Sequence, residues 1–132
     1  MPAPPADVVR QLYAAWSNLD VAAASDLYAP NVVFDWSRRH MDPLVADGRD
    51  AVVRATAELL EPWDEAGVEI ERLIEGEGWV LALVHAHGRG RASGAAGDAH
   101  VAHVWTVRDG LIERMEYYGD QAEALAAAGE AG

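Results

Sequence analysis

The stretch from His100 to Asp120, HVAHVWTVRDGLIERMEYYGD, constrains the fold more than any other part of the chain. Both of its halves are rich in β-branched and aromatic residues, and the Asp-Gly pair between them is the strongest short-range signal for a β-hairpin. Because side chains alternate between the two faces of a strand, one face of the first half is predicted to be buried. That face carries Val101, His103, Trp105 and Val107. After the turn, alternation places Leu111, Glu113, Met115 and Tyr117 on one face and Ile112 on the other.

His103 is the titratable side chain on this otherwise apolar face. An imidazole with an ordinary pKa near 6.5 can give or take a proton at neutral pH. His103 is therefore the first candidate catalytic residue, with Tyr117 across the hairpin as a hydrogen-bond donor to an oxyanion. The alternative is a neutral imidazole in an inert pocket, satisfied by Tyr13, Tyr28 or a water.

Length and charge narrow the possible classes of protein. With 132 residues, the chain is expected to form a single domain over residues 1–132, with a frayed lead at residues 1–6. It has 22 acidic residues against 10 basic ones, all Arg, and a formal net charge of -12, which argues against nucleic acid or anionic membrane as a partner. It has no cysteine, which excludes disulfides and fits a reducing compartment. No signal peptide or spanning apolar run is evident, so a soluble cytoplasmic protein is expected.

The order of the elements predicts an α+β domain. Apolar periodicity and capping residues predict helices at residues 7–19, 21–28, 50–61 and 121–129. Strands are predicted at residues 31–37, 68–76 and 79–90, in addition to the hairpin. Residues 38–48 and 91–97 are predicted to be loops. The strand at 79–90 has a bulky face and a small face, and the small face, with Ala82, Ala86 and Gly88, would leave space for a cavity.

With this order of elements, the chain resembles the nuclear transport factor two-like superfamily, and within it the SnoaL-like domains related to polyketide cyclases and ketosteroid isomerases. The resemblance runs from about Val8 to Ala128, and its most specific pieces are LYAAWSNLDVAAASDLYAPNVVFDW and HVWTVRDGLIERMEYY. It implies a cone-shaped, bent antiparallel or mixed sheet. Three helices of the N-terminal half would pack on the concave face, and a short helix would end the chain. Because one fold hosts many chemistries, the resemblance leaves the reaction open.

The catalytic residues of the relatives carry over only in part. The general-base aspartate of ketosteroid isomerases falls at Trp36, their oxyanion-hole tyrosine at Leu12 and their oxyanion-hole aspartate at His103, so none of the three is kept. The pocket histidine of SnoaL-like cyclases falls at His103 and is kept, whereas their catalytic aspartate falls at Tyr117. The Arg-Asp-Asp set of the related epoxide hydrolases is not evident. Asp35 remains a second candidate base if a bulge turns it inward, and the alternative is a surface carboxylate paired with arginine.

Aromatic and apolar residues are predicted to bind a flat ligand by stacking in the cavity. The predicted ligand-binding residues are Tyr13, Trp16, Tyr28, Trp36, Trp63, Val84, Trp105 and Met115. In the register of the resemblance, His85 and His87 point outward. With His100 they are weak evidence for a metal, because zinc needs three or four convergent ligands. No metal and no cofactor is therefore predicted, and the outer sheet face is expected to form a homodimer.

The leading hypothesis is a cofactor-independent acid-base enzyme of isomerase or cyclase type, acting on a small, mostly apolar carbonyl compound, with His103 transferring the proton. The first alternative is a non-catalytic binding protein for an aromatic or lipid-like metabolite. The second is a pairing module whose outer sheet face carries the function.

Overall fold

The structure, a computed structural model, describes residues 3–39, 43–61, 63–90 and 96–131, and for 63–66, 90, 96–97 and 130–131 it describes the backbone only. The helices are α1 (Pro5–Ser17), α2 (Val21–Ser25), α3 (Arg49–Leu60) and α4 (Gln121–Ala131). The strands are β1 (Tyr28–Asp35), β2 (Val45–Asp47), β3 (Trp63–Gly76), β4 (Trp79–Gly90), β5 (Ala96–Arg108) and β6 (Leu111–Tyr118).

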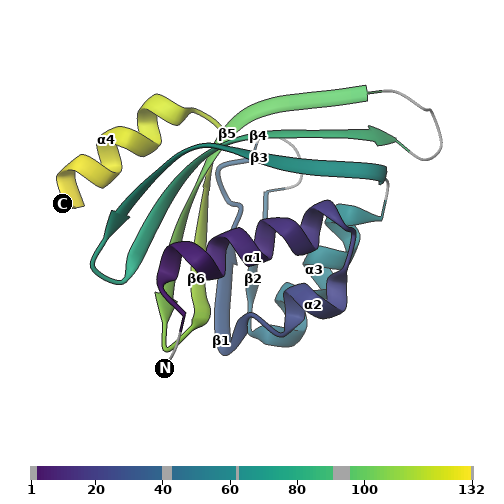
Figure 1. Ribbon diagram of the computed structural model, residues 1–132, viewed down its shortest axis with the longest axis horizontal. Coiled ribbons are helices and arrows are strands. Elements are labelled where there is room, and N and C mark those ends of the chain that lie inside the picture. Colours follow the sequence, from purple (N-terminus) through teal and green to yellow (C-terminus); the bar gives the residue numbers. More distant parts are fainter. Residues whose placement is uncertain (1–2, 40–42, 62, 91–95, 132) are drawn as a thin grey trace.

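In the described residues the strands form one curled sheet in the order β2-β1-β6-β5-β4-β3. β1 pairs with β6 in parallel, and the other neighbours pair antiparallel, so the sheet is mixed. Figure 1 shows α1, α2 and α3 on one side of the sheet and α4 on the other. This arrangement confirms the predicted α+β fold. No helix in the described part of the chain is long and apolar enough to cross a membrane.

The sequence explains where the first two helices begin. α1 begins at Pro5, two residues before the expected start, because proline is pre-organised for the first helical position and lacks the N–H that would stay unpaired there. Ala6 is already buried. Asp20 caps α2, since its Oδ1 accepts a hydrogen bond of 3.0 Å from the backbone N–H of Ala23.

The region around Tyr28 differs from the prediction. α2 ends at Ser25, and β1 begins at Tyr28 instead of residue 31. Tyr28 pairs with Ile112 of β6, and the register shifts between Tyr28 and Val33. Pro30 therefore lies in an irregular part of the strand, where its missing N–H is tolerated. The prediction that the second helix continues to residue 28 and is ended by Pro30 was therefore wrong, and the proline does not keep the chain out of the sheet.

One strand and two strand starts were also missed, among them the start of β5 at Ala96, which lies in the predicted loop at residues 91–97. The predicted loop at residues 38–48 contains β2, a three-residue edge strand in which Val45 is 54% exposed. Such a short, exposed strand leaves no alternating pattern in the sequence. β3 begins at Trp63 rather than at residue 68, and its register with β4 shifts between Trp63 and Glu65. Because a bulge breaks the alternation, the start of β3 could not be read from periodicity.

The predicted hairpin is confirmed, with one correction. Asp109 and Gly110 have φ values of 54° and 77°, as a tight two-residue hairpin turn requires. The pairing shifts from Thr106–Arg114 to Val107–Ile112, so β6 contains one extra residue. The bulge turns Ile112 to the same side as Met115, and both side chains are completely buried. The prediction that Ile112 and Met115 lie on opposite faces was therefore wrong.

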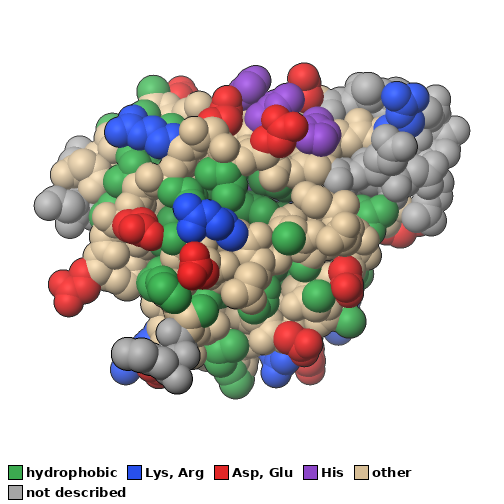
Figure 2. Space-filling model, in the orientation of Figure 1, with side chains coloured by type: hydrophobic (Ala, Val, Ile, Leu, Met, Phe, Trp, Pro, Cys, Tyr) green, Lys and Arg blue, Asp and Glu red, His purple; other side chains and the backbone are tan. Residues whose placement is uncertain are grey.

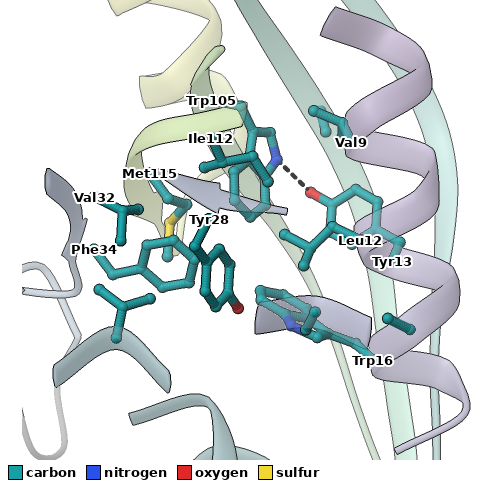
Figure 3. Packing of buried hydrophobic residues seen from close by; sticks show 14 of the residues in the cluster. Val9, Leu12, Tyr13, Trp16, Tyr28, Val32, Phe34, Trp105, Ile112 and Met115 are labelled. Atoms are coloured by element: carbon teal, nitrogen blue, oxygen red, sulfur yellow. Dashed lines mark hydrogen bonds between the residues drawn. The ribbon is translucent and has the colours of Figure 1, made fainter. Parts of the chain in front are cut away.

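The buried side chains form two clusters on the two sides of the sheet. The main core joins α1 to the inner sheet face, and Figure 3 shows Leu12, Trp16, Phe34 and Trp105 packed together within it. The small face of β4 points into this core, as predicted. On the outer face, α4 covers a second cluster formed by Leu81, Leu83, Ala102, Tyr118 and Ala124.

Candidate functional site

A cavity of about 430 Å³ lies between the helices and the inner face of the sheet. Its walls are mostly apolar side chains from α1, α3, the long strands and the segment after β1, among them Trp16, Trp36, Leu59, Leu60, Val68 and Val101. Small residues at Ala86, Gly88 and Ala99 leave the space open. The polar residues along its wall are His103, Tyr117, Arg39, His87 and Asp98, but the side chains of His87 and Asp98 pair with Glu69 and His85 on the outer face of the sheet. A mostly apolar cavity with few polar groups suits a small organic ligand.

A chain of two hydrogen bonds holds His103 at the cavity wall. The indole Nε1–H of Trp105 donates to Tyr13 Oη over 2.8 Å, which Figure 3 marks with a dashed line. Tyr13 Oη lies 2.7 Å from His103 Nδ1. α1 supplies the tyrosine and β5 supplies the other two residues. The docking of α1 on the sheet therefore fixes the orientation of the imidazole.

The direction of the second hydrogen bond follows from the first. Trp105 can only donate, so Tyr13 must place its own proton elsewhere. Tyr13 is 2% exposed, and among the described residues His103 Nδ1 is the acceptor for this proton. The opposite tautomer would leave a buried hydroxyl proton unsatisfied, at a cost of about 1–3 kcal/mol. His103 therefore carries its proton on Nε2, and this atom has no partner among the described residues.

Burial keeps both groups neutral. Desolvation lowers the pKa of His103 to about 4. Desolvation also raises the pKa of Tyr13 far above its ordinary value of 10.0, and the hydrogen bond from Trp105 opposes this shift only in part. At pH 7 the pair is uncharged, and the cavity receives a neutral N–H donor rather than an imidazolium.

Two rings predicted for the site lie next to His103. His103 and Tyr117 face each other across the β5–β6 ladder, with ring centroids 6.1 Å apart, and both line the cavity. The Trp16 ring stands nearly perpendicular to the imidazole, at 88° and 6.1 Å. Trp16 is 4% exposed, and its Nε1 has no hydrogen-bond partner of good geometry in the described residues. Trp36 also lines the cavity.

Five of the other predicted ligand-binding residues lie away from the cavity wall. Tyr13, Tyr28, Val84, Trp105 and Met115 belong to the packed main core. The side chain of Trp63 lies outside the described residues.

The hydroxyl of Tyr28 belongs to a second buried hydrogen-bond chain. Tyr28 Oη lies 2.8 Å from Thr56 Oγ1, which itself donates to the carbonyl of Val52 over 2.8 Å. The Tyr28 hydroxyl is therefore the donor in the first of these bonds. Burial raises its pKa, and the nearby polar groups of Thr56 and Trp16 oppose the shift. Tyr28 and Thr56 together join β1 to α3.

Asp35 lies on the opposite face of β1 from Phe34. It accepts a hydrogen bond from the backbone N–H of Ser37 over 2.9 Å and lies 3.4 Å from Arg114. Hydrogen bonds from Ser37, followed by the charges of Arg38 and Arg114, lower the pKa of Asp35. The bulge in β1 does not turn this side chain into the cavity. Asp35 is thus placed as the arginine-paired carboxylate of the alternative interpretation.

Comparison with known families identifies the fold group. Residues 9–115 match the SnoaL-like domain family. The chain belongs to this family. A search of curated proteins gives no match.

Solved structures with the same fold resemble this SnoaL-like domain over nearly its whole length. A Catenulispora acidiphila protein with a ketosteroid isomerase-like fold, in complex with trimethylamine, is 17% identical, covers 96% of this chain and 95% of its own, and has a TM-score of 0.76. A candidate SnoaL-like polyketide cyclase from Jannaschia sp. CCS1 is 16% identical, with coverages of 96% and 95% and a TM-score of 0.75. TerC, co-crystallised with polyporic acid, is 17% identical, with coverages of 94% and 97% and a TM-score of 0.73.

The outer face of this SnoaL-like domain carries a cluster of histidines and carboxylates. His85 lies 3.4 Å from Asp98 and 3.7 Å from Glu69, and it stacks on His100 with ring centroids 4.5 Å apart. His100 lies 3.0 Å from Glu71, which raises the pKa of this histidine. Figure 2 shows histidine and acidic side chains gathered along the upper edge of the molecule. Within the described ranges, no group of three or more such side chains has the geometry of a metal site.

Sequence reasoning missed several residues of the cavity. Ala99 follows the same alternation as Val101 and His103, so this signal was present in the sequence and could have been used. Leu60 lies near the end of the predicted helix at residues 50–61, and it lines the cavity. Arg39 lies in the irregular segment after β1, where no helical or strand periodicity predicts that its side chain reaches the cavity.

Proposed function

We propose that this SnoaL-like domain is a cofactor-independent acid-base enzyme of isomerase or cyclase type. Its substrate is a small, mostly apolar carbonyl compound held in the cavity, and His103 is its acid-base residue. The observation that carries the proposal is a buried, neutral His103 at the wall of a mostly apolar cavity of about 430 Å³. In an enolisation, the Nε2–H of His103 would hold the carbonyl oxygen and stabilise the negative charge that develops there, while the proton released from the substrate carbon would pass to a water molecule and return from it to the product.

Two further observations support this function. Tyr117 lies across the ladder from His103, so its hydroxyl is a candidate second donor to the same oxygen. Proteins of the same fold have been crystallised with small molecules, namely trimethylamine and polyporic acid. These neighbours support small-molecule binding, and the acid-base chemistry rests on His103.

A second candidate function is binding without turnover, as in a carrier for an aromatic or lipid-like metabolite. The occupation of His103 Nδ1 by Tyr13 and the lowered pKa favour this candidate, because both reduce the basicity of the ring. Asp35, the other candidate base, is held by Ser37 and Arg114 outside the cavity.

The experiment that separates these functions begins with a thermal-shift screen of steroid enones, anthraquinone-like polyketides, terpenoid epoxides and fatty acids. A ligand at 100 times its Kd adds about 2.7 kcal/mol to the free energy of unfolding, which is readily detected. For the class that binds, turnover and affinity are then compared between wild type and His103→Ala. A loss of turnover of about 100-fold with retained affinity supports the enzyme. Binding without turnover supports the carrier.

His85→Ala is the matched control, because it removes an imidazole that lies on the outer face and outside the cavity. Its turnover is expected to equal that of wild type. If no compound class shifts the melting temperature, both pocket functions are wrong.

We also propose that residues 1–132 act as one domain in the cytoplasm and that two copies pair through the outer face of β3, β4 and β5. The exposed strip around His85 and His87 is the expected contact, since α4 covers Leu83. His85→Glu would place a further carboxylate beside Glu69 and Asp98, so it should weaken the dimer in analytical ultracentrifugation. A wild-type protein that sediments as a monomer contradicts the pairing.

A further inference from the structure

We infer that the hydrogen-bond chain Trp105–Tyr13–His103 makes His103 a fixed donor, so that the cavity selects ligands that present a hydrogen-bond acceptor to Nε2. The ligand class is a neutral ketone, enone or quinone with its oxygen at the imidazole. Tyr13 is the positioning residue that sets this preference. The inference rests on the proposed function only in assuming that the cavity holds a ligand.

The preference for a ligand acceptor originates with Trp105, the most buried residue of the hydrogen-bond chain. Trp105 is 0% exposed, and its indole can only donate, so the lone pairs of Tyr13 are oriented toward β5. The hydroxyl proton of Tyr13 then points to His103 Nδ1. A neutral imidazole that accepts at Nδ1 has its proton at Nε2. Three residues from α1 and β5 thus determine which kind of atom the cavity offers to a ligand.

The surroundings of His103 strengthen this selection. The paired residue on β4 is Ala82, and the rings nearest in space are Tyr13, Trp16, Trp105 and Tyr117. Asp98 is five residues away along β5, which corresponds to about 17 Å, and its carboxylate pairs with His85 on the outer face. A ligand N–H or ammonium at Nε2 would therefore face another donor. A ligand carbonyl oxygen would give the N–H of His103 its missing partner.

The first test uses the protein alone. In a ¹⁵N-labelled sample at pH 7, the ring nitrogens of His103 should show an unprotonated Nδ1 and a protonated Nε2. Tyr13→Phe should change the Nδ1 shift and allow exchange between the two tautomers. Tyr28→Phe also removes a buried hydroxyl, but from the bond to Thr56, and it should leave the His103 signals unchanged. A proton on Nδ1 in the wild type would overturn the inference, and so would a spectrum that Tyr13→Phe does not alter.

The second test measures the ligand preference with a matched pair of probes. 2-Acetylnaphthalene carries a carbonyl oxygen, and 2-isopropenylnaphthalene replaces this oxygen by a CH₂ group of nearly the same shape. The ratio of their dissociation constants is compared between wild type and His103→Leu, so that the different hydration of the two probes cancels. One neutral hydrogen bond corresponds to a change of about tenfold in this ratio, in favour of the ketone in the wild type.

The outcomes separate this inference from the proposed function. If both probes bind and His103→Leu leaves the ratio unchanged, the acceptor preference is wrong, while the cavity still binds small molecules. If neither probe nor any screened compound binds, the proposed function fails. The His103 ring signals then still decide whether Tyr13 fixes the donor.

Discussion

The substitution Tyr13→Phe should destabilise this fold more than the chemically identical substitution Tyr28→Phe. Removing the Tyr13 hydroxyl leaves the indole N–H of Trp105 without an acceptor, at a site that is 0% exposed. A buried donor without a partner costs about 1–3 kcal/mol. Removing the Tyr28 hydroxyl leaves Thr56 still donating to the carbonyl of Val52, so that only the net value of one hydrogen bond is lost, about 0.5–1.5 kcal/mol.

Urea unfolding followed by tryptophan fluorescence measures the two free energies of unfolding, and equal m-values show that the unfolded states are comparable. For a domain of this size, 1 kcal/mol corresponds to about 3–5 °C in Tm. Tyr13→Phe should therefore lower Tm by roughly 5–10 °C, and Tyr28→Phe by no more than about half of that.

A double-mutant cycle isolates the interaction behind this difference. Trp105→Phe alone leaves a cavity, but in that background the Tyr13 hydroxyl no longer has an indole N–H to satisfy. The loss caused by Tyr13→Phe should then shrink by about 1 kcal/mol. Equal losses for the two tyrosines, together with a coupling energy near zero, would refute the assigned direction of the hydrogen bonds.

Three further predictions can be measured. His103 has a pKa of about 4 in the fold against 6.5 in the unfolded chain, so the wild type should lose on the order of 3 kcal/mol between pH 6.5 and 4, and urea titrations of His103→Leu should lack this loss. Ser37→Ala should raise the pKa of Asp35 more than Arg114→Gln does in a ¹³C carboxyl titration, because the side-chain hydrogen bond of Ser37 is the largest cause of the depression, although alanine keeps the backbone N–H bond. Leu12→Ala should cost about 2–5 kcal/mol in the same unfolding assay, since Leu12 is 0% exposed in the main core.

Local patterns in the sequence were enough to predict most of the fold. The Asp109-Gly110 turn, the Asp20 cap and the two faces of β4 each follow from residues within a few positions of one another. The failures occur where pairing with a distant strand overrides the local pattern. The bulge that buries Ile112 beside Met115 and the pairing that draws Tyr28 into β1 both depend on the partner strand. A single sequence does not contain the register that produces them.

The candidate site shows the same limit. Alternation along β5 placed His103 at the cavity, but its hydrogen-bond partner lies 90 residues earlier in the chain, on α1. The residue of α1 that contacts the imidazole depends on how α1 is rotated about its axis against the sheet. Helical periodicity predicts which stripe of the helix surface faces the sheet, but not which residue of that stripe lies next to His103. Leu12 and Tyr13 are neighbours in that stripe, and both are buried. The resemblance aligned Leu12 with a catalytic tyrosine, whereas the structure brings the adjacent Tyr13 to His103.

The chain has a net charge of -12, yet the end of its cavity next to His103 is uncharged. Burial explains this difference. An unpaired carboxylate among Trp16, Trp105 and the apolar strands would carry a desolvation cost of several kcal/mol. A histidine in the same place remains neutral by lowering its pKa, and Tyr13 decides which nitrogen keeps the proton. The acidic side chains meanwhile stay at the surface, where Glu69, Glu71 and Asp98 pair with the outer histidines. A neutral donor in an apolar cavity is suited to an uncharged carbonyl ligand, so the position of His103 and the overall acidity of the chain are compatible.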